Sequence, residues 1–162
     1  MHDQDTASTT PGGDSTSIAD GIHTTGHPTP RQSAGPGRTC YILLVEDDQS
    51  LASLEASTLI AQGFTVVSVE SGERAITALS QMRPDLVVLD LELTGSVTGW
   101  DVLRTIRAQS TTAPIPVLLT TSSIATVRTY IQVYGESKLT LDHLPKPYSI
   151  PTFLKRVRRM LV

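Results

Sequence analysis

The amino-acid sequence predicts an α/β protein with a doubly wound, parallel sheet of five strands. Short apolar runs alternate with segments of helical spacing five times between residues 40 and 162. Such alternation is typical of a parallel sheet with helices on both faces. Two of the runs, 41–45 and 86–89, are apolar without interruption, as expected of strands that are buried on both faces.

Residues 1–39 differ in composition from the rest of the chain. They are rich in Thr, Ser, Gly, Pro and Asp, and Ile18 and Ile22 are their only large aliphatic residues. A segment of this kind buries too little apolar surface to offset the entropy lost on ordering. We therefore predict a disordered N-terminal tail, residues 1–39, and one folded domain, residues 40–162.

Charge and hydropathy argue against several classes of partner. The formal net charge is −3, and the tail supplies −2 of it through four Asp and two Arg. The domain is thus close to neutral, and we do not expect DNA binding. No apolar run is long enough to span a membrane and no secretory signal is present, so we expect a soluble, cytoplasmic protein without membrane contact.

The first strand is residues 41–45, and a helix follows over about residues 49–62. Its apolar positions at three- and four-residue spacing are Leu51, Leu54, Thr58 and Leu59. Ser50 is suited to cap the start of this helix, and Gly63 is suited to end it.

The next strands and helices follow the same signals. Residues 64–69 are short and β-branched, residues 71–73 open a helix that stops before Pro84, and the third strand ends at Asp90. The later elements are a helix near residues 100–107, a strand over 115–120, a helix from Ser122 or Ser123 to about Tyr134 that Gly135 ends, a strand over 140–144, and a last helix from Ser149.

Polar side chains follow four of the predicted strands. Glu46, Asp47 and Asp48 follow the first, and Asp90 ends the third; Thr120, Thr121 and Lys146 follow the fourth and fifth. Ligands of open parallel sheets bind beyond the carboxyl ends of the strands. Converging carboxylates repel one another unless a hard cation such as Mg²⁺ relieves the repulsion, and a carboxylate beside Mg²⁺ can attack phosphorus. Taken singly, each residue is also an ordinary strand end, so the prediction rests on the set.

The spaced set resembles the receiver domain of two-component response regulators, over the whole predicted domain. The segments that carry the resemblance are 42–48, 84–90, 99–103, 116–121 and 144–147. The resemblance implies the strand order 2-1-3-4-5 of a flavodoxin-like sheet and a cis bond between Lys146 and Pro147. The roles that it implies are phosphoacceptor for Asp90, direct Mg²⁺ ligand for Asp47, ligand through water for Glu46, backbone-carbonyl ligand for Glu92, switch hydroxyl for Thr121 and phosphate-binding lysine for Lys146.

Three features depart from the usual pattern of that family. Thr94 stands where the family usually has proline, and Gly99 comes nine residues after Asp90 instead of eight. His143 occupies the position of the usual aromatic switch residue. Residues 136–141 form a longer segment than usual before the last strand.

The resemblance implies a signalling protein of a two-component phosphorelay, not an enzyme with a separate substrate. A histidine kinase or histidine phosphotransfer protein would donate the phosphoryl group to Asp90. Because no output domain follows, we expect a stand-alone receiver that signals to a downstream protein effector. The expected contact face, also for a homodimer, is the fourth helix, fifth strand and fifth helix.

One enzymatic alternative stays open at the level of sequence. Residues 90–94, Asp-Leu-Glu-Leu-Thr, resemble the nucleophile motif of haloacid-dehalogenase-type phosphatases, in which the first acid attacks and the second protonates the leaving group. That motif normally follows the first strand, and it leaves the acids at 46–47 without a role.

Overall fold

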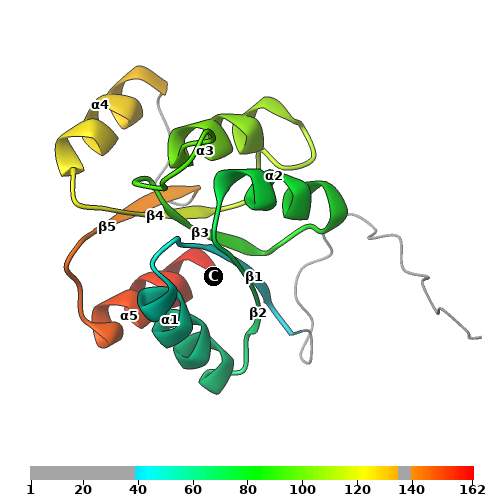
Figure 1. Ribbon diagram of the computed structural model, residues 1–162, viewed down its shortest axis with the longest axis vertical. Helices are drawn as coiled ribbons and strands as arrows, with labels where there is room; N and C mark the ends of the chain where they lie inside the picture. The colour runs from blue at the N-terminus through cyan, green and yellow to red at the C-terminus, as the bar shows by residue number, and fades with distance from the viewer. Residues whose placement is uncertain (1–38, 135–139) are drawn as a thin grey trace, which may run out of the picture.

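The computed structural model describes residues 39–134 and 140–162, and it contains five strands that alternate with five helices (Figure 1). Residues 1–38 of the predicted tail, and Gly135, lie outside the described residues. The strands are β1 (Tyr41–Val45), β2 (Thr65–Val69), β3 (Leu86–Asp90), β4 (Val117–Thr121) and β5 (Leu141–Pro145). The helices are α1 (Gln49–Ala61), α2 (Gly72–Gln81), α3 (Gly99–Ala108), α4 (Ile124–Tyr134) and α5 (Ile150–Met160).

The sheet is parallel throughout and has the order β2-β1-β3-β4-β5, which confirms the predicted order. β3 lies at its centre, and every residue of β3 is buried. The register sets Asp90 opposite Thr120, and Thr121 opposite Pro145. The ends of β3, β4 and β5 therefore meet at one edge of the sheet.

Two hydrophobic layers cover the sheet, because successive side chains of a strand point to opposite faces. In Figure 1, α2, α3 and α4 lie above the sheet, and α1 and α5 lie below it. Leu43 and Leu89 pack in the upper layer with Ile106 of α3. Leu44 and Val88 pack in the lower layer with the buried ring of Phe153 in α5.

The core-facing side of α1 differs from the prediction. Leu54 is 52% exposed, and the buried residues of α1 are Ala52, Glu55 and Leu59. Apart from Glu55, the helix carries no charged side chain, so its sequence has no polar face that would mark the solvent side. Packing against β1, β2 and α5 decides the rotation instead, and it buries the one acid of the helix.

The boundaries of several elements also shift by one to three residues. The N-cap of α1 is Asp48 instead of Ser50, because the Asp48 carboxylate accepts the backbone N–H groups of Ser50 (2.9 Å) and Leu51 (3.0 Å). β4 reaches Thr121 and β5 reaches Pro145 because the two residues pair with each other. Pairing between strands, which no single segment specifies, sets these ends.

Gly63 ends α1 as predicted, with φ at +86°, a conformation that glycine adopts without steric cost. Among the described residues, every helix falls short of the length and apolarity that crossing a membrane would require.

Candidate functional site

Three carboxylates lie together at the carboxyl-terminal edge of the sheet. Glu46 and Asp47 follow β1, and Asp90 ends β3. One oxygen of each carboxylate lies within 4.8 Å of the others. β1 and β3 are direct neighbours, with Val45 opposite Leu89, so strand pairing brings together acids that are distant in sequence.

Lys146, one residue beyond β5, links two of these acids. Its ammonium group donates hydrogen bonds to Asp90 Oδ2 (2.8 Å) and Glu46 Oε2 (2.9 Å). The side chains of Asp90 and Glu46 are only 3% and 2% exposed, whereas that of Lys146 is 21% exposed. Two buried carboxylates thus share one partly buried cation, and their charges need further neutralisation. The bond between Lys146 and Pro147 is cis, as the resemblance implied.

Burial has opposite effects on the two partners of this ion pair. Burial raises the pKa of Glu46, and the hydrogen bond from Lys146 offsets part of the increase. Burial alone would lower the pKa of Lys146, but hydrogen bonds with Asp90 and Glu46 outweigh it, and the pKa of the ammonium group is raised. Lys146 therefore stays positively charged across the physiological range.

Asp47 is held by the loop after β3. The backbone N–H and the hydroxyl of Thr94 both donate to Asp47 Oδ2, at 2.9 Å and 2.7 Å. The hydroxyl bond is the largest cause of a lowered pKa for Asp47. Both bonds engage the same oxygen, so they fix the orientation of the Asp47 carboxylate. The sequence showed Thr94 only as a departure from a pattern, with no signal that it reaches Asp47.

The loop after β3 also contacts the loop after β4. The backbone N–H of Glu92 donates to Asp90 Oδ1 (2.9 Å). The Glu92 carboxylate accepts hydrogen bonds from the backbone N–H (3.2 Å) and the hydroxyl of Ser122. Two loops at the acid site are thereby joined through side chains, a contact that the sequence did not predict.

Thr121 and His143 lie on the same face of the sheet. Thr121 is 1% exposed, and its hydroxyl accepts the backbone N–H of Ser123 at 3.0 Å. His143 pairs with Leu119 in the β4–β5 register, two residues before Thr121 on the same side of β4. This is the face that α4 covers.

Gly99 explains how the longer loop closes. A Cβ atom at this position would collide with the carbonyl oxygen of Asp90 and would lie 2.6 Å from Leu91 Cα. The first turn of α3 therefore packs directly on the end of β3, an approach that only glycine permits.

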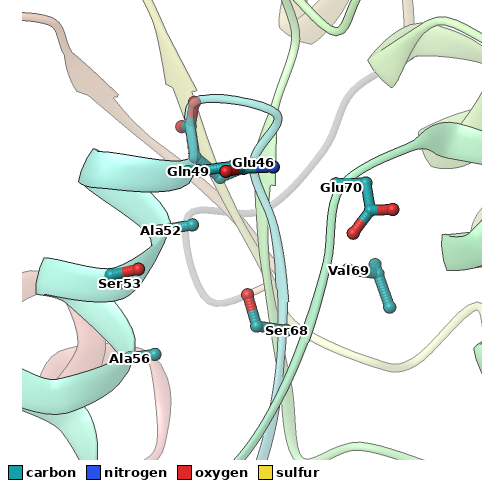
Figure 2. A pocket seen from close by; sticks show the side chains of 8 residues that line it. All are labelled: Glu46, Gln49, Ala52, Ser53, Ala56, Ser68, Val69 and Glu70. Atoms are coloured by element: carbon teal, nitrogen blue, oxygen red, sulfur yellow. The ribbon is translucent and has the colours of Figure 1, made fainter.

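A groove of about 310 Å³ opens beside Glu46, between α1 and β2. Figure 2 shows small side chains of α1, such as Ala52 and Ser53, on one side and Ser68 of β2 on the other, with Glu46 toward one end. The groove reaches the acid site from the α1 side of the sheet.

A second polar cluster lies below the acid site. Glu55 of α1 is fully buried, and its Oε1 accepts a hydrogen bond of 2.6 Å from the hydroxyl of Tyr148. The Tyr148 ring stacks on Phe153 of α5, with centroids 5.9 Å apart. Neither Glu55 nor Tyr148 was predicted as a site residue, and the single charge in an otherwise uncharged helix was the only available signal.

Comparison with known proteins identifies the family. The family model of the response regulator receiver domain matches residues 42–158. This chain belongs to that family. The phosphatase alternative gains no support from this result, because receiver domains are signalling modules of two-component systems that interact with histidine kinases.

Individual relatives of this receiver include regulators and isolated domains. "DNA-binding response regulator MtrA" of Mycobacterium tuberculosis (strain ATCC 25618 / H37Rv) is 38% identical over 120 residues, which are 74% of this chain and 50% of that protein. This receiver thus spans about half the length of that curated relative. The chemotaxis protein CheY4 of Vibrio cholerae has a TM-score of 0.67 and 25% identity, covering 76% of this chain and 100% of that chain.

A magnesium-bound relative bears on the acid group. The receiver domain of sensor histidine kinase PA1611 of Pseudomonas aeruginosa PAO1, with a magnesium ion coordinated in its active site cleft, has a TM-score of 0.65 and 25% identity over 76% of this chain and 98% of that chain. Receiver domains bind Mg²⁺ at an acidic pocket, and this chain has such a pocket in Glu46, Asp47 and Asp90. The all-oxygen donor set fits Mg²⁺.

Proposed function

We propose that Asp90 of this receiver accepts a phosphoryl group from a histidine kinase or a histidine phosphotransfer protein. The observation that carries the proposal is the ammonium group of Lys146, which bonds both Asp90 and Glu46 where the acids cluster. A lysine that is fixed beside a buried carboxylate can bind an oxygen of the incoming phosphoryl group.

The transfer is a nucleophilic displacement at phosphorus. One oxygen of Asp90 supplies the electron pair of the new O–P bond, while the P–N bond of a phosphohistidine breaks and the imidazole nitrogen keeps its electron pair. The backbone N–H of Glu92 already donates to Asp90 Oδ1, so the carboxylate is oriented before the donor arrives. Bound Mg²⁺ would neutralise the phosphoryl oxygens.

Each acid has a separate role in this proposal. Asp47 would hold Mg²⁺ directly, Glu46 would hold it through water, and Glu92 would offer its backbone carbonyl. The hydrogen bonds from Thr94 support the first role, because they engage one oxygen of Asp47 and orient the other. Glu92 would serve the metal through its backbone carbonyl, while its carboxylate accepts hydrogen bonds from Ser122.

Signalling would pass through Thr121 and His143. The Thr121 hydroxyl, which accepts a hydrogen bond from Ser123, would turn to donate to the phosphoryl group, and His143 on the same face would follow. The added charge, roughly −1.5 to −2, biases the α4–β5–α5 face between two states. That face is the proposed contact for a protein effector or a second copy of the chain.

A second candidate output is transcription control, because MtrA is described as a DNA-binding response regulator. This relationship removes support for the expectation that the protein does not bind DNA. An electrophoretic shift of duplex DNA by the phosphorylated chain, weakening steeply with salt, would favour this output. Binding of a protein or a second copy without any DNA shift would favour the α4–β5–α5 contact.

Phosphorylation of the full chain with Mg²⁺ and acetyl phosphate, followed by intact mass, tests the central proposal. The wild type should gain the mass of one phosphoryl group, and Asp90→Asn should gain none. Asp85→Asn is the matched control, because Asp85 lies just before the opposite end of the same strand. Equal labelling of wild type and Asp90→Asn would show that Asp90 is not the acceptor.

A further inference from the structure

Glu55 is a buried acid that the proposed mechanism does not use. It is 0% exposed in the middle of α1. Oε1 accepts the 2.6 Å hydrogen bond from Tyr148, whereas Oε2 is buried and has no hydrogen-bond partner among the described residues. A carboxylate anion needs partners for both oxygens when it is removed from water, so this environment favours the neutral acid.

The charges around Glu55 come from the ends of three strands. Glu46 after β1 and Asp90 at the end of β3 are negative, and Lys146 after β5 is positive. α1 has no other charged residue, and Arg158 of α5 donates to Gln62, one residue beyond the far end of α1. Among the described residues, Glu55 therefore has no cation of its own, because Lys146 is already shared by Glu46 and Asp90.

These surroundings change the acidity of Glu55. Burial raises its pKa to about 7, the hydrogen bond from Tyr148 opposes the increase, and the negative charge of Glu46 adds to it. The pKa of Tyr148 is also raised, by burial and by the bond to Glu55, so the phenol remains a hydrogen-bond donor. Glu55 is then the member of the pair that gains or loses a proton near neutral pH.

Tyr148 connects Glu55 to the phosphorylation site. It lies two residues after Lys146, and it is fixed at two points: its hydroxyl on Glu55 and its ring on Phe153. Lys146 in turn bonds Asp90. The hydrogen bond between Tyr148 and Glu55 thus fixes the segment that carries Lys146 to α1.

We propose that Glu55 is a positioning residue for phosphorylation of Asp90, and that its buried proton controls how readily Asp90 accepts and keeps the phosphoryl group. The inference rests on the proposed function of Asp90. With the proton bound, Glu55 is neutral and does not compete with the phosphoryl oxygens for the positive charge of Lys146. Loss of the proton to solvent places another negative charge near a site that must accept a phosphoryl charge of roughly −1.5 to −2. The deprotonated carboxylate also attracts the ammonium group of Lys146, which the phosphoryl oxygens need.

The relation is reciprocal, because two coupled equilibria influence each other by the same factor. If deprotonation of Glu55 disfavours the phosphoryl group, then phosphorylation of Asp90 must strengthen the binding of the proton by Glu55. Rising pH should therefore slow phosphorylation and reduce the phosphorylated fraction, whereas falling pH should favour both, through the range where Glu55 titrates.

The test is the pH dependence of phosphorylation of the full chain by acetyl phosphate with saturating Mg²⁺. Glu55→Gln keeps the acceptor for Tyr148 and cannot ionise. The ratio of the wild-type rate to the Glu55→Gln rate should fall about three- to tenfold between about pH 6 and about pH 8.5. Titration of His143 and of acetyl phosphate is common to both proteins and cancels in the ratio. Glu73→Gln, an exposed glutamate of α2, is the matched control and should leave the wild-type profile unchanged.

Infrared spectroscopy supplies a readout that does not depend on the rate. The wild type at pH 6 should show the band of a protonated carboxylic acid that Glu55→Gln lacks, and the band should disappear with a midpoint near the pKa of about 7. After phosphorylation the midpoint should move to higher pH. Absence of this band from the wild type would overturn the inference.

The remaining outcomes separate this inference from the proposed function. If wild type and Glu55→Gln are both phosphorylated with a constant ratio at every pH, Glu55 is only structural, and the inference is wrong while the acceptor role of Asp90 stands. If folded wild type gains no phosphoryl group at any pH, the proposed function fails and the inference fails with it. Glu55→Leu should be phosphorylated slowly. A faster reaction of Glu55→Gln than of Glu55→Leu at pH 6 would support the positioning role.

Discussion

The acid edge of the sheet and the interface of α1 with α5 each bury a glutamate, but they support it differently. At the edge, Glu46 shares the ammonium group of Lys146 with Asp90. Below it, Glu55 has only the hydroxyl of Tyr148, and one of its oxygens has no partner among the described residues. The comparison shows that burial alone does not determine how an acid is used. The hydrogen bond from Lys146 offsets part of the effect of burial on Glu46, whereas Glu55 has no hydrogen-bonded cation among the described residues, and its burial favours the protonated form.

The largest expected effect comes from removing that cation. Lys146→Met should leave Glu46 and Asp90 buried without their partner, so folding should lose about 3 kcal/mol. Phosphorylation of Asp90 should slow by about 100-fold or more. Urea unfolding and the acetyl phosphate reaction measure the two effects. Lys155→Met, at an exposed position of α5, should change neither, and similar behaviour of the two variants would contradict the central place given to Lys146.

The pH dependence of stability tests the other glutamate. The pKa of Glu55 is raised from 4.5 to about 7. Between these two pH values the folded state holds a proton that the unfolded state has lost. Stability then decreases as pH rises. Between about pH 5.5 and about pH 8.5 the wild type should lose about 2 kcal/mol relative to Glu55→Leu. Urea midpoints at both pH values measure this difference, and parallel changes in the two proteins would show that Glu55 does not titrate in this range.

Thr94 provides a smaller test at the acid edge. Thr94→Val removes the hydroxyl that donates to Asp47 and keeps the shape of the side chain. Because that bond is the main cause of the lowered pKa of Asp47, the pKa should rise, and Mg²⁺ should bind about tenfold more weakly as Asp47 loses its orientation. Calorimetric titration with Mg²⁺ measures the affinity. Thr94→Ser retains a hydroxyl and should bind Mg²⁺ as the wild type does.

The smallest effect is expected at another buried acid, Asp142 of β5. Its carboxylate, 5% exposed, accepts hydrogen bonds from Arg156 at 2.8 Å and from Arg159, whose side chains are 33% and 52% exposed. Asp142→Asn should cost about 1 kcal/mol in unfolding free energy, because water can solvate both arginines once they are released. Phosphorylation by acetyl phosphate should be unaffected. A loss of unfolding free energy as large as that of Lys146→Met would mean that solvent exposure of the cation does not reduce the cost of breaking the ion pair.

The basic last helix illustrates what composition could not reveal. The helix carries four cations, Lys155, Arg156, Arg158 and Arg159, and positive charge near the carboxyl end of a helix is commonly solvated and favoured by the helix dipole. Arg156 and Arg159 instead bind Asp142. The contact joins α5 to β5, and only the relative position of helix and strand creates it.

The sequence by itself determined the fold class, the order of elements and the acids at the strand ends. Continuous apolar runs such as 86–89 require burial on both faces, and Asp90 at the end of such a run has to lie at the edge of the sheet. These features follow from local pattern and from the geometry of parallel sheets, so they needed no knowledge of contacts.

The tertiary structure alone decided the rotation of α1 and the partners of the site residues. The spacing of Leu51 and Leu54 suggested one face of that helix, but packing buried Glu55, which bonds Tyr148 of the loop between β5 and α5. The contact of Thr94 with Asp47 also depends on tertiary structure, because the bond joins residues that are 47 positions apart. Hydrogen bonds between residues so far apart along the chain depend on how complete helices and strands pack. Hydrophobic periodicity within one segment carries no information about them.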